Sequence, residues 1–310
     1  MSRSIAITGA TGFIGGRIAD RLLAAGYTVK ALVRSTSPPK TSHEPAIQWI
    51  HGALEESDSL QRLVENVDAV IHCAGVVRGT TQQSFDTVNA VGVRRLARIC
   101  AKQSPAPRFL LLSSLAAREP SISPYAASKR KGEQIIANSS EPLPWTALRA
   151  PAVYGPGDRA LLPLFQLMSR GVAPILGPKA ARFSLLHVDD LAAAVLHWLA
   201  SGCSRKIYEL DDGRTGGYCW DDAVNTAEAL RGKHVVRIPV SAFAMRRLAA
   251  VNVALARLFR YAPMLTPGKV RELRHCDWVC DNREWSRAIG WKPQVSLEAG
   301  LRNMLDWKID

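Results

Sequence analysis

The sequence lacks the features of membrane-spanning, fibrous and disordered proteins. None of the uninterrupted apolar runs in its 310 residues approaches the roughly 18 residues that a spanning helix needs. Apolar residues make up 47% and charged residues 22% of the chain, as in ordinary globular proteins. A β-like apolar run at residues 5–7 begins so close to Met1 that we expect no signal peptide. We therefore expect a cytoplasmic protein of at most two domains, with peripheral attachment to the inner face of a membrane as the alternative.

Cysteine is scarce, and its spacing fits no common framework. The cysteines contain no C-x-x-C pair and stand mostly in apolar surroundings, which predicts reduced thiols. His275, Cys276 and Cys280 stand close together, but their spacing matches no common zinc pattern, and we expect no metal site. The six cysteines are Cys73, Cys100, Cys203, Cys219, Cys276 and Cys280.

Acidic residues are also scarce, because 27 Asp and Glu stand against 40 Lys and Arg and leave a formal charge of +13. A basic chain suits an anionic ligand, nucleic acid or an anionic membrane. The excess is concentrated in residues 241–274, where Glu272 is the single acid. On a helical wheel of about 100° per residue, Arg246, Arg257 and Arg260 fall on one side. An apolar set falls on the other, namely Leu248, Val251, Leu255, Leu258 and Phe259.

This basic segment allows two interpretations. A basic amphipathic helix can lie on an anionic membrane or cover an apolar substrate. The same pattern also fits an ordinary packed helix with a solvated basic face. No nucleic-acid-binding motif accompanies the charge, and we therefore expect no nucleic-acid partner.

Short β-branched runs alternate with helix-like stretches through the first half of the chain. Repeated βα units predict a parallel sheet with helices on both faces. Residues 155–183 are richer in Gly and Pro and look like an insertion, and the pattern after residue 211 is mainly helical. The predicted strands are residues 5–8, 28–33, 47–50, 69–72, 108–113, 146–149 and 206–210, and the predicted helices are residues 17–25, 59–65, 89–102, 125–138 and 187–200.

A glycine-rich turn joins the first predicted strand to the first predicted helix. It reads Thr8-Gly9-Ala10-Thr11-Gly12-Phe13-Ile14-Gly15. Gly9 permits a tight turn, Gly12 lets the backbone approach a diphosphate, and Gly15 permits close packing of helix on strand. The helix N-terminus adds free N–H groups and the positive end of the helix dipole. The turn, with Thr8, Thr11, Phe13 and Ile14 among its contacts, predicts dinucleotide binding.

Together these patterns predict an α/β protein with a Rossmann-type doubly wound parallel sheet and a smaller, mainly helical C-terminal substrate region. The nucleotide-binding domain is predicted over residues 1–155 plus 184–210. The substrate-binding region is predicted over residues 156–183 plus 211–310.

The end of the second predicted strand indicates which nucleotide is bound. An acidic side chain there would accept a hydrogen bond from the ribose of NAD and repel the 2′-phosphate of NADP. No Asp or Glu occurs from residue 21 to residue 43, and Val33 is followed directly by Arg34. Arginine is suited to phosphate by its planar fork and permanent charge. The sequence predicts NADP(H), and NAD(H) is the less favoured cofactor.

Four motifs resemble an extended short-chain dehydrogenase/reductase. They are the turn at residues 8–15, Tyr125-Ala126-Ala127-Ser128-Lys129, the stretch Leu148-Arg149-Ala150-Pro151-Ala152-Val153-Tyr154-Gly155-Pro156-Gly157, and His187-Val188-Asp189-Asp190-Leu191-Ala192. The resemblance covers residues 1 to about 210. The tail, residues 277–307, is similar to the ends of bacterial members of the epimerase/dehydratase family.

Tyr125 and Lys129 carry a chemical argument of their own. On a helix they lie one turn apart on the same face. A nearby ammonium would stabilise the phenolate and lower the pKa of the tyrosine. We therefore expect Tyr125 to exchange a proton with a substrate carbonyl or alcohol.

The resemblance implies roles for further residues. Ser114, rather than Ser113, would donate a hydrogen bond to the carbonyl oxygen, and Lys129 would also hold the nicotinamide ribose. Asn89 would organise water and backbone around the lysine, and a capping or core asparagine is the competing interpretation. His187, Asp189 and Asp190 would form a clasp between domains and cap a helix. The remaining cofactor contacts implied are Leu54, Cys73, Ala74, Gly75, Pro151 and Val153.

Three functions compete for this sequence. A reductase would act on a small-molecule ketone or alcohol with NADP(H), and a nucleotide-sugar epimerase or dehydratase would retain NAD. A cofactor-binding accessory subunit would need neither Tyr125 nor Lys129. Ala152 stands where sugar-nucleotide members often carry asparagine, and the motif around it is more similar to 3β-hydroxysteroid dehydrogenases and dihydroflavonol reductases.

A lipid-like ketone is the predicted substrate class. Residues 161–176, with Phe165 and Met168, are mostly apolar. Bacterial lipid-ketone reductases such as ceramide reductases belong to this broad family. Peripheral contact with an anionic membrane and a homodimer are the partner arrangements considered besides the substrate.

Overall fold

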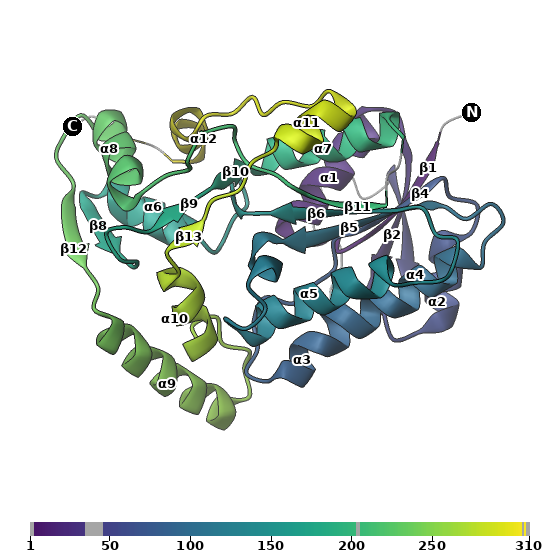
Figure 1. The fold of residues 1–310 in the computed structure, drawn as a ribbon, viewed down its shortest axis with the longest axis horizontal. Helices are drawn as coiled ribbons and strands as arrows, with labels where there is room; N and C mark the ends of the chain where they lie inside the picture. The colour runs from purple at the N-terminus through teal and green to yellow at the C-terminus, as the bar shows by residue number, and fades with distance from the viewer. Residues whose placement is uncertain (1–2, 35–45, 203–204, 306, 308–310) are drawn as a thin grey trace.

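A seven-stranded, wholly parallel sheet forms the centre of the molecule in the computed structural model, which describes residues 3–34, 46–202, 205–305 and 307 (Figure 1). The strand order is β11-β6-β5-β4-β1-β2-β3. The strands are β1 (Ser4–Thr8), β2 (Thr28–Val33), β3 (Ile47–His51), β4 (Ala69–His72), β5 (Arg108–Ser114), β6 (Trp145–Ala150) and β11 (Lys206–Glu209). The chain order reverses between β1 and β4, and this reversal is the switch point at which such sheets bind ligands. The predicted Rossmann-type fold is confirmed.

Helices cover both faces of the sheet because its strands are apolar on both sides. β1 and β4 are almost completely buried, as expected for central parallel strands. One face carries α1 (Phe13–Ala24) and α7 (Val188–Ala200), which pack together with α11 (Arg283–Ile289) beside them. The other face carries α2 (Ser57–Val64), α3 (Gln82–Asp86), the π-helical turn η2 (Thr87–Gly92), α4 (Val93–Ala101) and α5 (Pro124–Ala137), with the short 3₁₀ turn η3 (Leu115–Arg118) between β5 and α5.

Short parallel pairs build the second region. They are β7 (Ala152–Tyr154) with β10 (Leu185–His187), β8 (Val172–Ile175) with β12 (Val236–Pro239), and β9 (Arg182–Phe183) with β13 (Asp277–Trp278). Its helices are α6 (Leu162–Ser169), α8 (Trp220–Arg231), α9 (Ala242–Phe259), α10 (Pro267–Arg274) and α12 (Leu297–Met304). Phe165 and Met168 are buried in the core of this region. They therefore pack against protein and do not line a substrate pocket, contrary to the expectation that they indicate an apolar substrate site.

The division of the chain into a nucleotide-binding domain and a substrate-binding region stays a prediction, but the packing shows that the two parts share a core. Trp285 and Trp291, from the predicted substrate region, are buried in the core that lies under α1 and α7. The ring of Tyr208 in β11 lies 5.0 Å from that of Trp285. The C-terminal segment thus returns to cover the edge strand of the nucleotide-binding sheet. None of the helices in the described part of the chain is both long and apolar enough to cross a membrane.

Of the residues predicted to form a clasp and a cap at the start of α7, His187 caps the helix and Asp190 binds a segment far along the chain. His187 caps the helix, and its Nδ1 accepts the N–H of Asp189 at 3.3 Å. The buried Asp190 carboxylate accepts the backbone N–H groups of Gln294 at 3.0 Å and Val295 at 2.9 Å. Asp189 faces the other way and binds Arg17 of α1. The two neighbouring carboxylates therefore tie α7 to different parts of the chain.

The clasp generates a stability prediction. We expect Asp190→Ala to lower the free energy of unfolding by about 2–4 kcal/mol, because two charge-assisted hydrogen bonds are lost in a buried place. Asp189→Ala is the control, since its half-exposed partners Arg17 and Arg21 make it worth about 1 kcal/mol or less. Urea unfolding measures both. Equal losses for the two variants would contradict the assignment of Asp190 as the clasp.

Candidate active site

The candidate residues meet at the carboxyl edge of the sheet. β1, β4, β5 and β6 are parallel neighbours that end at Thr8, His72, Ser114 and Ala150. The segments that follow these strands therefore leave the sheet at one edge. This edge gathers the glycine-rich turn, the loop after β4, Ser114 and the motif after β6, as the sequence predicts.

Each of the three glycines in the turn has a different steric role. Gly9 has a φ of +79°, and a Cβ there would lie 2.8 Å from the backbone nitrogen of Ala74. A Cβ on Gly15 would lie 2.2 Å from the carbonyl oxygen of Gly9, so helix α1 can approach the turn only with glycine there. A Cβ on Gly12 would meet only that same oxygen, at 3.2 Å, within 4 Å among the described residues. Gly12 thus keeps an open approach to the helix end.

The N-terminus of α1 fits the diphosphate of a dinucleotide. The helix begins at Phe13 after Gly12, which offers no side-chain cap, and its first turn contains no acid. The N–H groups of the first turn, including that of Ile14, have no partner within the helix. Thr11 is exposed directly before it. An anion would therefore meet free donors and the positive end of the dipole.

The end of β4 is fixed to the turn by hydrogen bonds. Thr8 Oγ1 accepts the N–H of Ala74 at 3.2 Å and lies 2.8 Å from Nδ1 of His72. Burial, with the positive charge of Lys129 as a smaller cause, lowers the pKa of His72 to about 3. His72 is therefore a neutral structural partner. Burial raises the pKa of the Cys73 thiol to about 12, so that this thiol stays protonated.

Asn89 holds the loop after β4 against the helix α5. Its Oδ1 accepts the N–H of Val76 and its Nδ2 donates to the carbonyl of Val76, both at 2.9 Å. Nδ2 also donates to the hydroxyl of Ser128 at 2.9 Å. A Cβ on Gly75 would lie 3.1 Å from Oδ1 of Asn89 and 3.9 Å from Nζ of Lys129. Asn89 thus organises backbone close to the lysine, and it does so from the π-helical turn η2.

Ser114, Tyr125 and Lys129 lie together between β5 and α5. The hydroxyl of Ser114 lies close enough to Tyr125 to favour its phenolate, and it accepts a hydrogen bond from the N–H of Ala116 at 3.2 Å. Lys129 Nζ donates to the carbonyl oxygen of Leu112 at 2.6 Å. A serine, a phenol and an amine therefore converge at the end of β5.

The expected lowering of the Tyr125 pKa is wrong for this structure. Burial raises the pKa of Tyr125 to about 12, and the hydroxyl of Ser114 and the charge of Glu272 are smaller causes of opposite sign. Burial lowers the pKa of Lys129 to about 8, and Glu133 partly opposes this shift. Desolvation disfavours both charged forms, and the ammonium is directed to a carbonyl. Tyr125 is therefore a protonated phenol at neutral pH.

Sequence reasoning missed a buried ionic cluster behind these residues. Glu133 is 1% exposed and accepts hydrogen bonds from Arg149 Nε at 2.8 Å, Arg149 Nη2 at 2.7 Å and the hydroxyl of Ser113 at 2.6 Å. Arg149 Nη1 reaches Glu209 of the edge strand at 3.3 Å. Ser113 is thus structural, as expected. The available signal was the spacing of Glu133, one turn beyond Lys129 on the same helix face.

The helix α10 contacts the start of α5, which sequence reasoning also missed. Ser123 caps α5 and donates its hydroxyl proton to the carboxylate of Glu272. Arg271 Nε donates to the carbonyl oxygen of Ile122 at 2.7 Å. Gly268 lies where a Cβ would come within 3.1 Å of Ser123. The second region therefore touches the chain directly before Tyr125.

The remaining predicted contacts lie on the same side of the sheet. Arg34 is exposed just after β2. Leu54 is buried, and its side chain packs where a Cβ on Gly92 would lie. Its carbonyl oxygen accepts a hydrogen bond from Nη1 of Arg95 at 2.7 Å. Pro151 and Val153 are partly buried and flank the exposed Ala152.

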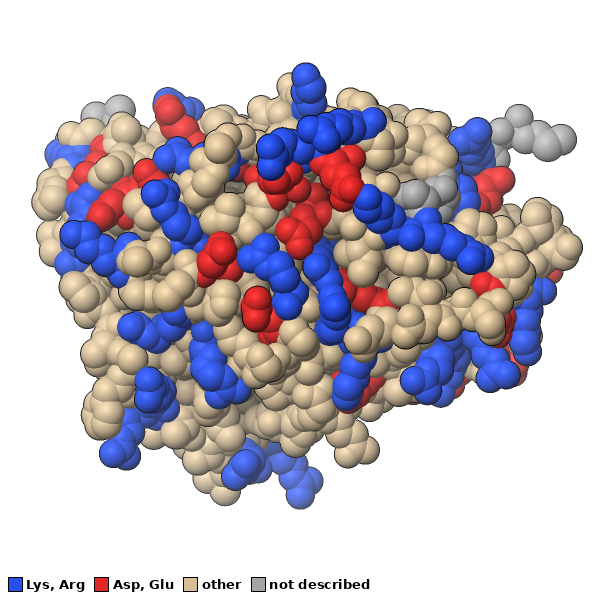
Figure 2. All heavy atoms as spheres, viewed as in Figure 1, with Lys and Arg blue, Asp and Glu red and all other residues tan. Residues whose placement is uncertain are grey.

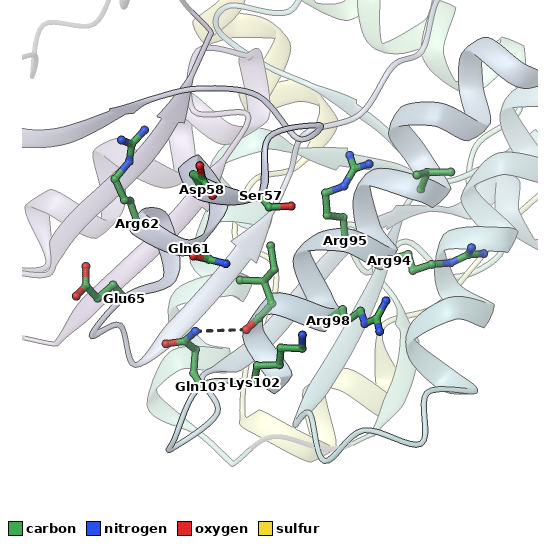
Figure 3. Close-up of a pocket in the computed structure, with 12 residues that line it drawn as sticks. Ser57, Asp58, Gln61, Arg62, Glu65, Arg94, Arg95, Arg98, Lys102 and Gln103 are labelled. Atoms are coloured by element: carbon green, nitrogen blue, oxygen red, sulfur yellow. Dashed lines mark hydrogen bonds between the residues drawn. The ribbon is translucent and has the colours of Figure 1, made fainter.

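A separate basic groove lies between α2 and α4 (Figure 3). Its volume is about 840 Å³, and none of the candidate catalytic residues lines it. The side chains in Figure 3 come from α2 and Glu65 directly after it on one wall, and from η2, α4 and the two residues that follow α4 on the other. Its basic residues are Arg62, Arg94, Arg95, Arg98 and Lys102.

Comparisons with known proteins identify the family. Residues 5–210 match the model of the NAD dependent epimerase/dehydratase family. A ceramide reductase from Caulobacter vibrioides is 34% identical over 98% of this chain and 93% of that protein. A 2-alkyl-3-oxoalkanoate reductase from Stenotrophomonas maltophilia is 27% identical over 97% of this chain and 98% of that protein.

A solved structure extends the comparison to the fold. A UDP-glucuronic acid 4-epimerase from Bacillus cereus superposes with a TM-score of 0.75 and 21% identity, over 97% of each chain. At that identity the likeness concerns the architecture alone.

The pKa of Lys129 provides a direct test of the site. We expect its ε-methylene signal, followed by NMR of lysine-labelled protein and assigned with Lys129→Met, to titrate near pH 8. Glu133→Gln should move the midpoint to lower pH, because the carboxylate favours the charged ammonium. Asp86→Asn is the control, since Asp86 pairs with the exposed Lys131 of the same helix. A midpoint above pH 10 in the unaltered protein would contradict the burial of the lysine.

Proposed function

This chain belongs to the NAD-dependent epimerase/dehydratase family, and we propose that it is an NADP(H)-dependent reductase that converts a ketone of a lipid-like substrate into a secondary alcohol. The observation that carries the proposal is the grouping of Ser114, Tyr125 and Lys129 at the nucleotide edge of the sheet. An accessory subunit without catalysis would not need this grouping.

The protonated phenol favours reduction. When bound, the nicotinamide would supply a hydride to the carbonyl carbon. Ser114 would donate a hydrogen bond to the carbonyl oxygen as negative charge develops there. Tyr125, whose raised pKa keeps its proton in place, would pass that proton to the same oxygen. Lys129, one helical turn away, would stabilise the phenolate that remains.

Arg34 supports NADP(H) as the cofactor. It is exposed at the carboxyl end of β2, where the fold places the adenosine ribose. No Asp or Glu that would repel a 2′-phosphate occurs between residues 21 and 43. The planar guanidinium fits such a phosphate with two parallel hydrogen bonds.

The relatives support a ketone with an alkyl chain. The two curated relatives reported above are both named as reductases, and one name specifies an alkyl-substituted oxoalkanoate. Ala152 is exposed beside the site and offers a methyl group where a sugar-nucleotide enzyme would use a polar side chain. This favours an apolar substrate over a nucleotide sugar.

Substitution of the proton donor tests the reaction. We expect Tyr125→Phe to abolish NADPH-dependent turnover across a panel of ketones graded by chain length, with cofactor affinity nearly unchanged, because only the transferable proton is removed. Tyr27→Phe is the matched control and should keep full activity. Activity near normal in Tyr125→Phe would overturn the mechanism. Purified protein that retains NAD(H) and shows no net turnover would indicate a nucleotide-sugar epimerase or dehydratase instead.

Substitution of Arg34 tests the cofactor. Loss of one charge-assisted pair predicts that Arg34→Ala weakens NADPH binding about tenfold to a hundredfold and leaves NADH binding almost unchanged. Arg98→Ala, which removes a different exposed arginine, should change neither affinity. Titration with each nucleotide measures the effect. An equal response of both nucleotides would show that Arg34 does not bind the 2′-phosphate.

A further inference from the structure

The helix α9 is attached to the protein by only one of its faces. Met245 and Ala249 form a small core with Val270 of α10, and Ala256 on the same helix is also buried. Asn252 fastens the middle of the helix, because its Nδ2 donates to the carbonyl oxygen of Leu265 at 2.9 Å. Figure 1 shows α9 at the outer edge of the molecule, next to α10 and away from the central sheet. The helix is therefore firmly docked while its opposite side is uncovered.

The uncovered side carries an apolar stripe. The side chains that sequence analysis grouped together are exposed, with Leu258 at 72%, Phe259 at 69%, Leu248 at 59%, Val251 at 57% and Leu255 at 43%. At about 100° per residue they occupy one continuous sector, distinct from the buried face. An ordinary packed helix buries its large apolar residues. In α9 the buried residues are Met245 and two alanines, while the larger apolar side chains of the stripe are exposed.

The exposed surface of α9 is also basic, mainly on the side of the helix away from this stripe. Residues 229–271 contain nine Lys and Arg and no Asp or Glu. Of these, Arg246, Arg247, Arg257 and Arg260 are exposed and form no ion pair with any residue in the described part of the chain. Figure 2 shows basic side chains along the lower edge, in the region of α9 and in the same view as Figure 1, with no acidic atoms among them. The surface is thus both apolar and uniformly positive.

We propose that the exposed face of α9 binds the surface of an anionic lipid bilayer. The apolar stripe would enter the boundary between headgroups and acyl chains, and the long arginine side chains on the other side of the exposed surface would reach anionic headgroups. Two copies of the chain fit this face less well, because a symmetric pairing would bring its unpaired arginines against each other. Charge complementarity therefore selects the lipid surface.

The proposed surface is connected to the active site, and this step rests on the proposed function. α9 packs on α10, and Glu272 and Arg271 of α10 bind Ser123 and Ile122 directly before Tyr125. A protein held to a bilayer by α9 would thus keep the start of α5, directly before Tyr125, on the side of the molecule that faces that bilayer. A lipid ketone would then have a short path from the membrane to the phenol.

Vesicle co-sedimentation tests the proposal. We expect the full-length protein to bind phosphatidylcholine vesicles that contain phosphatidylglycerol, to bind pure phosphatidylcholine vesicles weakly, and to be released by salt. Leu258→Asp and the double variant Arg257→Glu/Arg260→Glu should each lower the partition coefficient by about tenfold or more. Both sites are highly exposed, so circular dichroism should show an unchanged fold.

Control variants at other basic surfaces test whether vesicle binding depends on α9 specifically. Arg98→Glu, in the groove between α2 and α4, and Arg302→Glu, on α12, each reverse one charge at an exposed place, and combined they match the charge change of the double variant. They should bind vesicles like the unaltered protein. Absence of binding, equal binding to neutral vesicles, or loss of binding in Arg98→Glu alone would overturn the proposal. Self-association that Leu258→Asp abolishes, without vesicle binding, would assign the face to a second copy instead.

Two further measurements keep this inference apart from the proposed function. Tyr125→Phe should still bind vesicles, and Leu258→Asp should still reduce a short, water-soluble ketone at the normal rate. Vesicle binding without ketone reduction would remove the proposed function and leave the surface in place. Ketone reduction without vesicle binding would remove only the surface.

Discussion

The buried carboxylate of Glu133 is the constraint around which α5 is arranged. A charge that is 1% exposed must be paired, and removing one partner of such a pair costs about 3–5 kcal/mol. Arg149 of β6 supplies a two-pronged partner, and Ser113 of β5 adds a third hydrogen bond. The helix can satisfy these bonds in only one register against the two strands. That register also places Lys129 and Tyr125, one and two turns earlier, at the carboxyl edge of the sheet.

Burial, more than the charge of Glu133, sets the electrostatics of the site. Glu133 favours the ammonium of Lys129, but burial outweighs it and lowers the pKa of the lysine to about 8. Burial also raises the pKa of Tyr125 to about 12. The phenol thus keeps its proton while the amine stands close to its titration point. Such a pair suits proton donation, which is the step that ketone reduction requires.

The sequence predicted what local patterns encode. The central strands are apolar runs, the turn needs glycine at Gly9 for its positive φ, and the site residues follow strand ends. It could not predict the pairing of Glu133 with Arg149, which depends on the register between a helix and a strand. Contact between Ser123 and Glu272 joins residues 149 positions apart. The direction of the Tyr125 pKa shift was predicted wrongly because desolvation is a property of the folded surroundings.

The residues that dock α9 onto the protein differ from the large apolar residues that it exposes. Its buried face uses Met245 and two alanines, so that the helix would dock equally well if its outer positions were polar. Six exposed large apolar side chains on that outer side, from Phe243 to Phe259, therefore contribute nothing to the attachment of the helix and would favour aggregation if they stayed in water. Unpaired arginines on the same helix keep such faces apart in solution. A feature that costs solubility and adds no packing calls for an external partner, and the segment that carries it is the one that completes the start of the catalytic helix.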